Sequence, residues 1–531
     1  MKFLPVLLFC LLSALCSFLP AAEWRPVAFP EQIQFPLPKD IPANHPLKLI
    51  ELLPFEADSQ YLTKPAAWEG IADAFPRSLP RFVKKRDRLY SRWILIDQAT
   101  GKSLTSFTYA QPDSEIAAHR TAINWPASPK GVQCVVDVDD VLKLGVKYVA
   151  QNVDIRPLFD LNKKSNLTWA VDGEKFHFNS GAIQGLDHYV SRMTDAGVNV
   201  TFILLNYVPT RPDPSNPLIH PQTNLTDAPN HLGAFNLTDE AGYRHYRAVV
   251  EFLADRYTAG KPEQGTISGI IIGNELQAHW WWYNLGQMPA DEVISEYARA
   301  LRVAQLAVSK AHPELRTYVS LDQHWTHYMI EDKTKFIPGK QFLEGLNQQI
   351  KTEGNFPWHV AQHPYPQNLF NPRTWSDDQA TYDLDTKKIT FRNLEVLTTF
   401  LHQPEFLYQG KPRRIILSEQ GFHCEEGEAG ERVQAAAYAY AFYRTRQFEE
   451  IDAFILHRHV DHAHEGGLRL GLRAFAPGTF TSPGEKRMIY DVFQQADSDD
   501  WEQHFEFAKP IIGIQSWSEL DPKPVEMSSP N

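Results

Sequence analysis

Cysteine is scarce in this sequence, with four residues in a chain of 531. Two of them, Cys10 and Cys16, lie in the apolar segment that begins the chain, which leaves Cys134 and Cys424 in the remainder. An exported protein could pair these two in a disulfide bond. We expect two packed thiols instead, because the predicted strands that carry them are not neighbours.

Long apolar runs and clusters of positive charge are also missing beyond the first residues. After residue 22, no run reaches the roughly 18 apolar residues that a membrane-spanning helix needs. The formal net charge is −12 and the lysines and arginines form no stripe, which argues against a nucleic-acid partner. The mild acidity mostly indicates solubility.

Residues 1–22, MKFLPVLLFCLLSALCSFLPAA, predict a secretory signal peptide. Lys2 gives a positive start, an apolar stretch follows, and the small residues Ala21 and Ala22 precede the polar chain. A retained membrane anchor is the alternative, but the stretch is short and interrupted by proline. We therefore expect a secreted or periplasmic protein without membrane contact once the signal is removed.

Two further regions flank the central part of the chain. Residues 23–128 are rich in proline and aromatic side chains and predict an extended arm with a small β module. Within them, residues 86–109 contain two strand-like runs around Asp97-Gln-Ala-Thr-Gly101, which is typical of a hairpin. The tail, residues 501–531, carries a strand-like segment at 504–517 that we expect to pack on this module.

Between residues 129 and 500, apolar strand-like runs alternate with amphipathic helical patterns. Strands that are apolar throughout indicate a parallel sheet buried on both faces. The eight runs are residues 130–136, 146–155, 199–207, 267–275, 316–325, 358–365, 413–421 and 451–462. Eight units predict an α/β fold of the (β/α)8 TIM-barrel type. A doubly wound sheet is the rival, but no glycine-rich phosphate loop follows the first run and the count of eight favours closure.

Polar side chains end these apolar runs, and in a barrel such positions converge on one face. They are Gln151, Asn152, Asn206, Asn274, Glu275, Gln323, His324, His363, Tyr365, Glu419, His457 and His459. Two of them are carboxylic acids, Glu275 on the fourth strand and Glu419 on the seventh. Strands three apart in a ring of eight lie on opposite sides of the mouth, so a pyranose ring could fit between the two acids.

Hydrolysis of an acetal requires this equipment. One protonated carboxyl group donates a proton to the leaving oxygen, and one ionised carboxylate attacks or stabilises the oxocarbenium-like centre. The two environments must push the two pKa values apart. Retention of configuration further requires the carboxyl groups to lie about 5 Å apart.

The motifs at these strand ends resemble clan A of the glycoside hydrolases, the retaining (β/α)8 enzymes. Its members end the fourth strand in Asn-Glu and the seventh in Glu, as Asn274-Glu275 and Glu419 do here. The resemblance implies that Glu275 is the general acid/base, that Glu419 is the nucleophile and that Asn274 holds the sugar 2-hydroxyl. It also implies that Tyr365, which follows His363-Pro364, hydrogen-bonds the nucleophile. The arrangement is similar to that of secreted bacterial barrels known only as a domain of unknown function, so no substrate follows from it.

Two positions depart from the clan A pattern. Many members have an arginine on the second strand, where this chain offers Gln151 or Asn152. Members often place a tryptophan after the eighth strand, where this chain has His457-Arg458-His459. Both departures bear on which sugar the central subsite accepts.

Histidines and indoles near the strand ends supply further candidates. His457 and His459 point the same way on a strand, and they would either hold a catalytic metal, hydrogen-bond ligand hydroxyls, or bind an acidic sugar together with Arg458. Trp280 and Trp281, in the run His279-Trp-Trp-Trp-Tyr283, are candidates for stacking on sugar rings, and so is Trp325. We expect at least one indole of the run to be buried and at least one to line the site.

The sequence thus predicts a secreted retaining glycoside hydrolase that acts on an oligo- or polysaccharide, which could be acidic. We expect no cofactor and no metal. The candidate sugar-binding residues are Asn274, Tyr365, His363, Asn206, Trp280, Trp281, Trp325, His457 and His459. The rivals are a metal-assisted barrel hydrolase that uses His457 and His459, and a barrel that binds glycans without cleaving them.

Overall fold

In the computed structural model, which describes residues 24–209, 211, 213 and 216–527, eight parallel strands close into a barrel. They follow chain order as β11 (Lys130–Gln133), β12 (Tyr148–Asp154), β15 (Asn199–Leu205), β16 (Ile267–Ile272), β17 (Arg316–Leu321), β18 (Trp358–Gln362), β19 (Ile415–Gln420) and β20 (Ile451–Leu456). Each strand falls within a predicted run, so the TIM-barrel prediction is confirmed. The predicted signal peptide lies outside the described residues.

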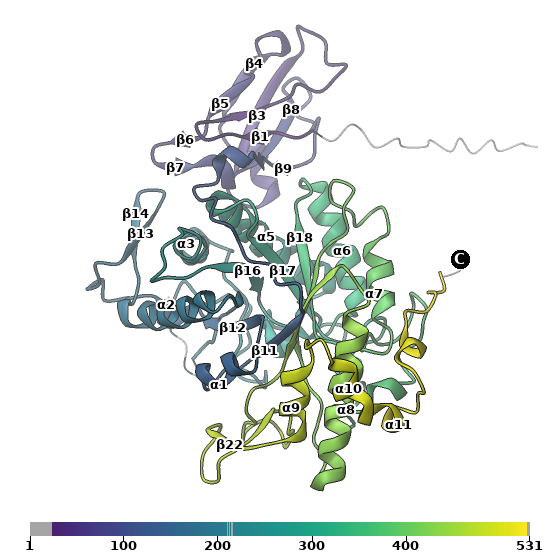
Figure 1. Ribbon diagram of the computed structural model, residues 1–531. Helices are drawn as coiled ribbons and strands as arrows, with labels where there is room; N and C mark the ends of the chain where they lie inside the picture. Colours follow the sequence, from purple (N-terminus) through teal and green to yellow (C-terminus); the bar gives the residue numbers. More distant parts are fainter. Residues whose placement is uncertain (1–23, 210, 212, 214–215, 528–531) are drawn as a thin grey trace, which may run out of the picture.

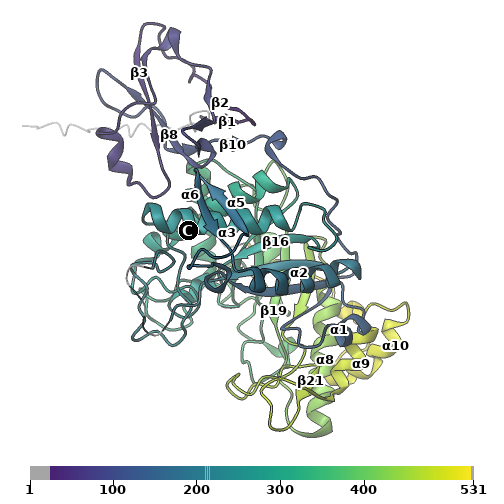
Figure 2. The same ribbon diagram turned by 90° about the vertical axis from the view of Figure 1, so that its left-hand side faces the viewer.

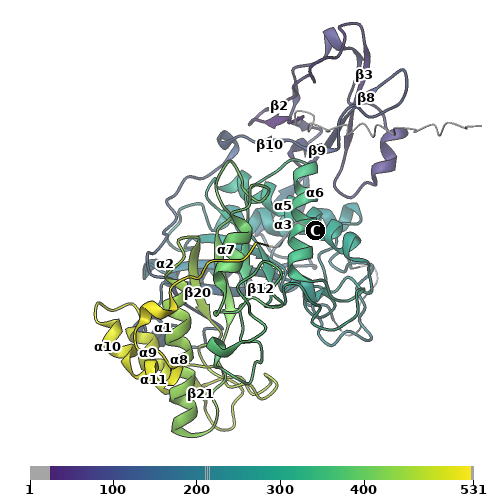
Figure 3. The same ribbon diagram turned by 90° about the vertical axis from the view of Figure 1, so that its right-hand side faces the viewer.

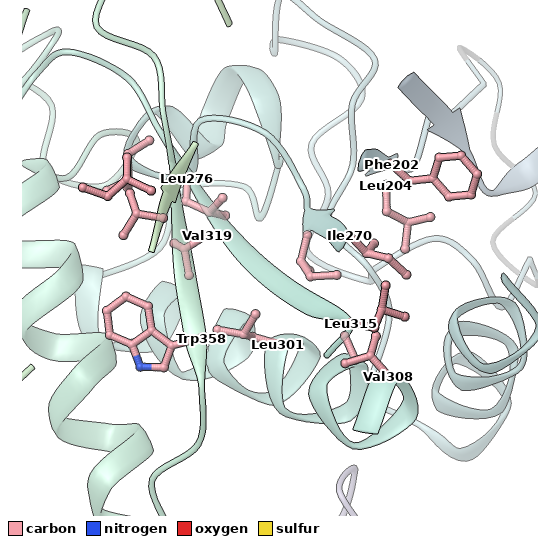
Figure 4. Packing of buried hydrophobic residues seen from close by; sticks show 14 of the residues in the cluster. Phe202, Leu204, Ile270, Leu276, Leu301, Val308, Leu315, Val319 and Trp358 are labelled. Atoms are coloured by element: carbon pink, nitrogen blue, oxygen red, sulfur yellow. The ribbon is translucent and has the colours of Figure 1, made fainter. Parts of the chain in front are cut away.

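The apolar strands bury both of their faces. On β16, Ile270 and Ile272 belong to the large core between the strands and the outer helices, whereas Ile271 belongs to the core inside the barrel. Neighbouring strands repeat this alternation, with Val319 facing outward and Tyr318 inward on β17. Figure 4 shows part of the outer core, where strand residues such as Val319 and Ile270 lie among helix residues such as Leu301 and Val308. The period of two along each strand explains why the runs carry no polar face.

Outer helices follow the strands in the predicted alternation. They are α1 (Val138–Lys143), α2 (Ser180–Asp195), α3 (Glu240–Arg256), α5 (Ala290–Ala311), α6 (Gly339–Thr352), α7 (Leu394–Leu401), α8 (Gly427–Thr445) and α9 (Met488–Gln495). Several begin at an acidic or amide side chain that accepts from free backbone N–H groups of the first turn, as Asp137 does for α1, Asn179 for α2 and Asp239 for α3. Four-residue α4 (His279–Trp282) lies in the loop after β16.

The N-terminal residues form the predicted β module. One sheet joins β10 (Gln111–Pro112), β1 (Val27–Ala28), β2 (Gln32–Gln34) and β5 (Ser78–Pro80), and the other joins β4 (Trp68–Ile71), β3 (Pro46–Leu52), β8 (Arg92–Asp97) and β9 (Thr108–Tyr109). The predicted hairpin is confirmed, since β8 and β9 pair antiparallel. Two short strands, β6 (Phe82–Val83) and β7 (Arg86–Asp87), also pair. The module stands at one end of the barrel in all three views (Figures 1, 2 and 3).

A buried carboxylate fastens the module to the barrel. Glu251 on α3 is 2% exposed. Its oxygens accept hydrogen bonds from Tyr90 of the module (2.6 Å), Trp169 of the β13 (Thr168–Val171) and β14 (Glu174–His177) hairpin (2.8 Å), Arg247 (2.9 Å) and Lys310 of α5 (3.0 Å). Burial opposes ionisation, but these cations and donors outweigh it and hold the pKa of Glu251 well below its usual range.

The C-terminal tail differs from its prediction. The strand predicted at 504–517 is wrong, because this segment forms α10 (Trp501–Phe505), α11 (Lys509–Ile512) and helical turns between and after them. The aromatic residues of the tail pack on α8, with the Trp517 ring 5.3 Å from that of Tyr443. The described tail therefore covers the barrel rather than the β module, at the other end of the molecule (Figure 3). None of the helices in the described ranges has the length and apolarity to cross a bilayer.

Two short strands follow the barrel's last strand, β21 (Arg473–Phe475) and β22 (Pro483–Lys486), and they form a hairpin. It lies at the end of the molecule opposite the β module (Figure 1). The loops that follow the strands' carboxyl ends therefore face away from the module.

Candidate active site

Glu275 stands at the end of β16 in an unusual backbone conformation. Its φ of 37° and ψ of 64° lie in the left-handed region, and its N–H donates to the Ser320 hydroxyl of β17 at 3.0 Å. Gly273, two residues earlier, has φ 74°, and a Cβ there would come within 2.6 Å of the Tyr283 ring. The turn Gly273-Asn274-Glu275 thus ends the strand abruptly and turns the carboxylate into the mouth of the barrel. Residues held in such conformations concentrate at functional sites.

Glu419 lies near the end of β19, and the Tyr365 hydroxyl donates to its Oε1 at 3.2 Å. His363, just after β18, lies between the two acids. Its Nδ1 is 2.9 Å from Oε1 of Glu275, and its Nε2 is 3.0 Å from the Ser418 hydroxyl. One side-chain oxygen of Glu275, one of Glu419 and a ring nitrogen of His363 all lie within 4.8 Å of one another. The two predicted carboxylates therefore meet at one place.

The surroundings push the pKa values of the two acids in opposite directions. Burial raises the pKa of Glu275, and the negative charges of Asp322 and Glu419 add to this effect, although the bond to His363 opposes it. Burial would also raise the pKa of Glu419, but the positive charges of His457 and His363 and the hydrogen bonds from Gln133 and Tyr365 outweigh it and lower that pKa. One acid is thus biased to hold a proton and the other to be ionised, as acid and nucleophile roles require.

His457 and Asn274 also lie at this mouth. His457 Nδ1 is 2.8 Å from the Gln133 amide nitrogen, and its Nε2 is 2.6 Å from Oε1 of Glu465. Burial alone would lower the pKa of His457, but the anionic groups around it, Glu419 among them, raise it well above its usual value. Asn274 is half-buried, with its Oδ1 3.5 Å from the Ser320 hydroxyl. The predicted residues Glu275, Glu419, His363, Tyr365, His457 and Asn274 are therefore brought together.

Three predicted sugar contacts are used in other ways by the fold. The Asn206 amide donates to the backbone carbonyls of Leu218 and Ala234 and so holds the loop after β15 in place. Trp325 is 1% exposed, and its indole N–H donates to the Leu384 carbonyl, which makes it a core residue. His459 is fully buried. Its Nε2 lies 3.0 Å from Asp140, and its Nδ1 accepts from the Val136 N–H.

The tryptophans after Glu275 lie on α4, where one is buried, as expected, and two are half-buried. Trp280 is buried, with the Lys335 ammonium 4.7 Å from its ring centre. Trp281 is half-buried and packs edge-on against Phe336. Trp282, which was not among the predicted contacts, is half-buried against the core inside the barrel. Trp282 is therefore the indole of this run that packs against the inner core.

Other residues of the mouth were missed. Gln133 ends β11 and bonds Glu419, and its signal was present, since it is a polar residue inside an apolar run. Asp322 follows β17 and raises the pKa of Glu275. Glu465 comes from the loop after β20, where no periodic pattern marks it. Tyr207, which follows β15, is 40% exposed and close enough to Glu419 to sense its charge.

His457 and His459 do not share a metal site of the kind considered from the sequence. His457 faces Glu465, whereas His459 faces Asp140. Over the described ranges, the side chains spaced to share one cation are Glu275, His363 and Glu419. Both ring nitrogens of His363 already face protein partners, Glu275 and the Ser418 hydroxyl. This donor set suits a hydrogen-bonded network better than a cation.

Comparison with solved structures finds barrels at low sequence identity. A family 39 glycoside hydrolase from the gut symbiont Bacteroides cellulosilyticus WH2 is 12% identical, over 90% of this chain and 82% of that one, with a TM-score of 0.45. A hyperthermophilic β-glucosidase from Pyrococcus furiosus is 12% identical over 70% and 86% of the two chains, with a TM-score of 0.43. A monomeric β-xylosidase from Caulobacter crescentus CB15 is 12% identical over 72% and 69%, with a TM-score of 0.42.

Comparison with curated proteins finds no match. A family model does match, over residues 122–520, which takes in the whole barrel and most of the described tail. Its description is a family of unknown function, DUF5722. The chain belongs to this family, DUF5722.

Proposed function

We propose that this protein is an exported glycoside hydrolase that cleaves an oligo- or polysaccharide with retention of configuration. The observation that carries the proposal is the meeting of Glu275 and Glu419, with oxygens within 4.8 Å and pKa values shifted in opposite directions. Carboxyl groups about 5 Å apart leave no room for a water molecule between acid and base, so the second acid must itself attack the sugar.

The proposed mechanism is a double displacement. Glu419 attacks the anomeric carbon while the bond to the leaving oxygen breaks and Glu275 donates its proton to that oxygen. A water molecule then attacks the glycosyl-enzyme, and Glu275 takes its proton. Tyr365 and Gln133 hold the Glu419 carboxylate, and Ser320 fixes the backbone of Glu275.

His363 supports the exchange of roles by Glu275. Its imidazole contacts the Glu275 carboxylate on one side and the Ser418 hydroxyl on the other. Burial would lower the pKa of His363, but the bond to Glu275 and the charge of Glu419 raise it. His363 therefore stabilises Glu275 when that residue is ionised, which is the state left after the first step.

The test begins with a panel of polysaccharides, acidic ones included, to find a substrate. On that substrate, Glu275→Gln and Glu419→Gln are each expected to lose most of the turnover. Glu426→Gln, at a side chain that is 92% exposed, serves as the matched control. A near-full rate in either of the first two variants would contradict the assigned roles.

Azide separates the two roles. In Glu419→Gly, azide can occupy the space of the missing carboxylate, and the expected product is a glycosyl azide of inverted configuration. In Glu275→Gly, azide attacks the glycosyl-enzyme, and the expected product has retained configuration. The opposite pattern would exchange the assignments.

Turnover that disappears with a chelator and returns with a divalent cation would instead favour a metal-assisted hydrolase, and binding of a glycan without cleavage would favour a glycan-binding barrel.

A further inference from the structure

Cys134 lies at the mouth of the barrel, directly after β11, and is partly exposed. Its φ of 52° places it in the left-handed region, which a residue with a side chain adopts at a cost. Its Sγ is 3.8 Å from Nδ1 of His457. The thiol thus contacts an imidazole that already belongs to the surroundings of Glu419.

His457 is in turn held by a carboxylate. Its Nε2 lies 2.6 Å from Oε1 of Glu465, and Arg458 donates to the same oxygen at 2.9 Å. Burial raises the pKa of Glu465, but the hydrogen bonds and charges of His457 and Arg458 outweigh this effect and lower the pKa to about 2. A thiol, an imidazole and an orienting carboxylate in contact form the arrangement that activates sulfur nucleophiles.

The charges around the thiol favour the same chemistry. Arg458 and His457 both sense Cys134, and each would be stabilised as a cation by a thiolate at that position. Glu419 and Glu465 are the anions of the cluster, and Glu465 is already neutralised by its two cationic neighbours. Reactive cysteines are found beside histidine and arginine side chains in partly exposed places, as Cys134 is here.

The second cysteine of the described residues provides a contrast. Cys424 is 3% exposed, its Sγ donates to the Glu425 carbonyl at 3.3 Å, and burial raises the pKa of its thiol. Such a thiol is inert. The two cysteines of one fold therefore occupy opposite environments.

We propose that Cys134 is a nucleophilic thiol, oriented by His457 and Glu465, that reacts with soft electrophiles at the mouth of the barrel. With an alkyl halide, the sulfur forms a bond to carbon, the carbon–halogen bond breaks, halide leaves and the thiol proton passes to solvent. With a small disulfide, a new S–S bond forms, the old one breaks and one thiol leaves with a proton. The added group then lies beside His457 and close to Glu419, so it obstructs the site of the proposed glycosidase.

The experiment treats the full chain in its native state with limiting iodoacetamide near neutral pH and measures the alkylation of each cysteine-containing peptide by mass spectrometry. Cys134 is expected to react at least about tenfold faster than Cys424. His457→Gln is expected to lower the rate at Cys134 by about tenfold, because it removes a cation beside the thiol, and Glu465→Gln by a few-fold, because it removes the carboxylate that holds this cation. His188→Gln, at an exposed position on α2, is the matched control and should leave the rate unchanged.

Circular dichroism establishes that each variant is folded, and Glu465→Gln alone decides the question if His457→Gln does not fold. Equal rates at Cys134 and Cys424, or a Cys134 rate that neither variant changes, would overturn the proposal and leave an ordinary exposed thiol. A second measurement, loss of sugar hydrolysis after alkylation and its absence in Cys134→Ser, rests on the proposed function. The alkylation rates do not depend on turnover, so failure of the one proposal is distinguishable from failure of the other.

Discussion

The variant Glu251→Gln tests how much the buried carboxylate that joins the β module to the barrel contributes to stability. The change keeps the shape of the side chain and removes its charge. Arg247, which is 2% exposed, then retains Asp172 as its anionic partner at 3.0 Å. Removing one partner of a buried ion pair costs about 3–5 kcal/mol, because the remaining charge stays desolvated. For a chain of this size, that loss corresponds to a fall of about 3–5 °C in Tm.

The assay is thermal unfolding followed by circular dichroism, with Glu240→Gln as the matched control. Glu240 lies on the same helix and pairs with Arg244 one turn away, but its side chain is 56% exposed. Such a pair contributes about 0.3–0.5 kcal/mol, so the control should unfold close to the wild type. Equal Tm values for the two variants would refute the claim that the buried carboxylate stabilises the fold.

The same pair of proteins tests the sign of the pH dependence. The pKa of Glu251 is lower in the folded chain than in the unfolded one, so the unfolded chain binds the proton more readily. Its stabilisation is therefore complete above the ordinary glutamate pKa and is lost as the pH falls through that range and below it. The Tm gap between wild type and Glu251→Gln should narrow on acidification, and a gap that widened would show that the charge opposes folding.

Three further outcomes are expected. Tyr365→Phe removes a hydrogen bond to the Glu419 carboxylate, so kcat/KM should fall by about 10- to 100-fold, and the acid limb of its pH profile should move to higher pH because Glu419 becomes harder to ionise. Asp322→Asn removes a negative charge that raises the pKa of Glu275, so the basic limb should move to lower pH; an unmoved limb would deny Glu275 the acid role. Trp325→Ala should cost about 3–5 kcal/mol in unfolding free energy by chemical denaturation while the folded enzyme keeps its kcat/KM, and lost turnover in a folded variant would restore Trp325 as a sugar contact.

The fold was predictable because its strands are buried on both faces. Runs such as ISGIII carry no alternating polar face, since their one polar residue, Ser268, is itself buried, and a parallel sheet covered on both faces tolerates that pattern. The tail was not predictable in the same way. The apolar residues of 504–517 follow no strict period. Trp517 lies in a helical turn and packs on Tyr443 of α8, a contact between distant segments that the local sequence does not encode.

The core of the site was equally accessible to sequence reasoning, because parallel strands deliver their last residues to one rim. Glu275 and Glu419 needed only the order of the strands. Asn206 and Trp325 also follow barrel strands, yet their side chains donate hydrogen bonds to backbone carbonyl groups of long loops. Glu465 went unnoticed because a loop without periodicity brings it back to His457. What strand order leaves undetermined is the path of the loops.

The β module packs against the far ends of α5 and α6, where Thr108 and Tyr109 both donate to the carbonyl of Glu353, the residue directly after α6. Those helix ends lie beneath the barrel, on the side where the strands begin. A glycan bound at the rim would therefore lie on the opposite side of the barrel from the module. Substitutions on the outward strands of the module would therefore change the binding properties of that surface. They would affect the rim of the barrel only if they disrupted the contacts of Glu251.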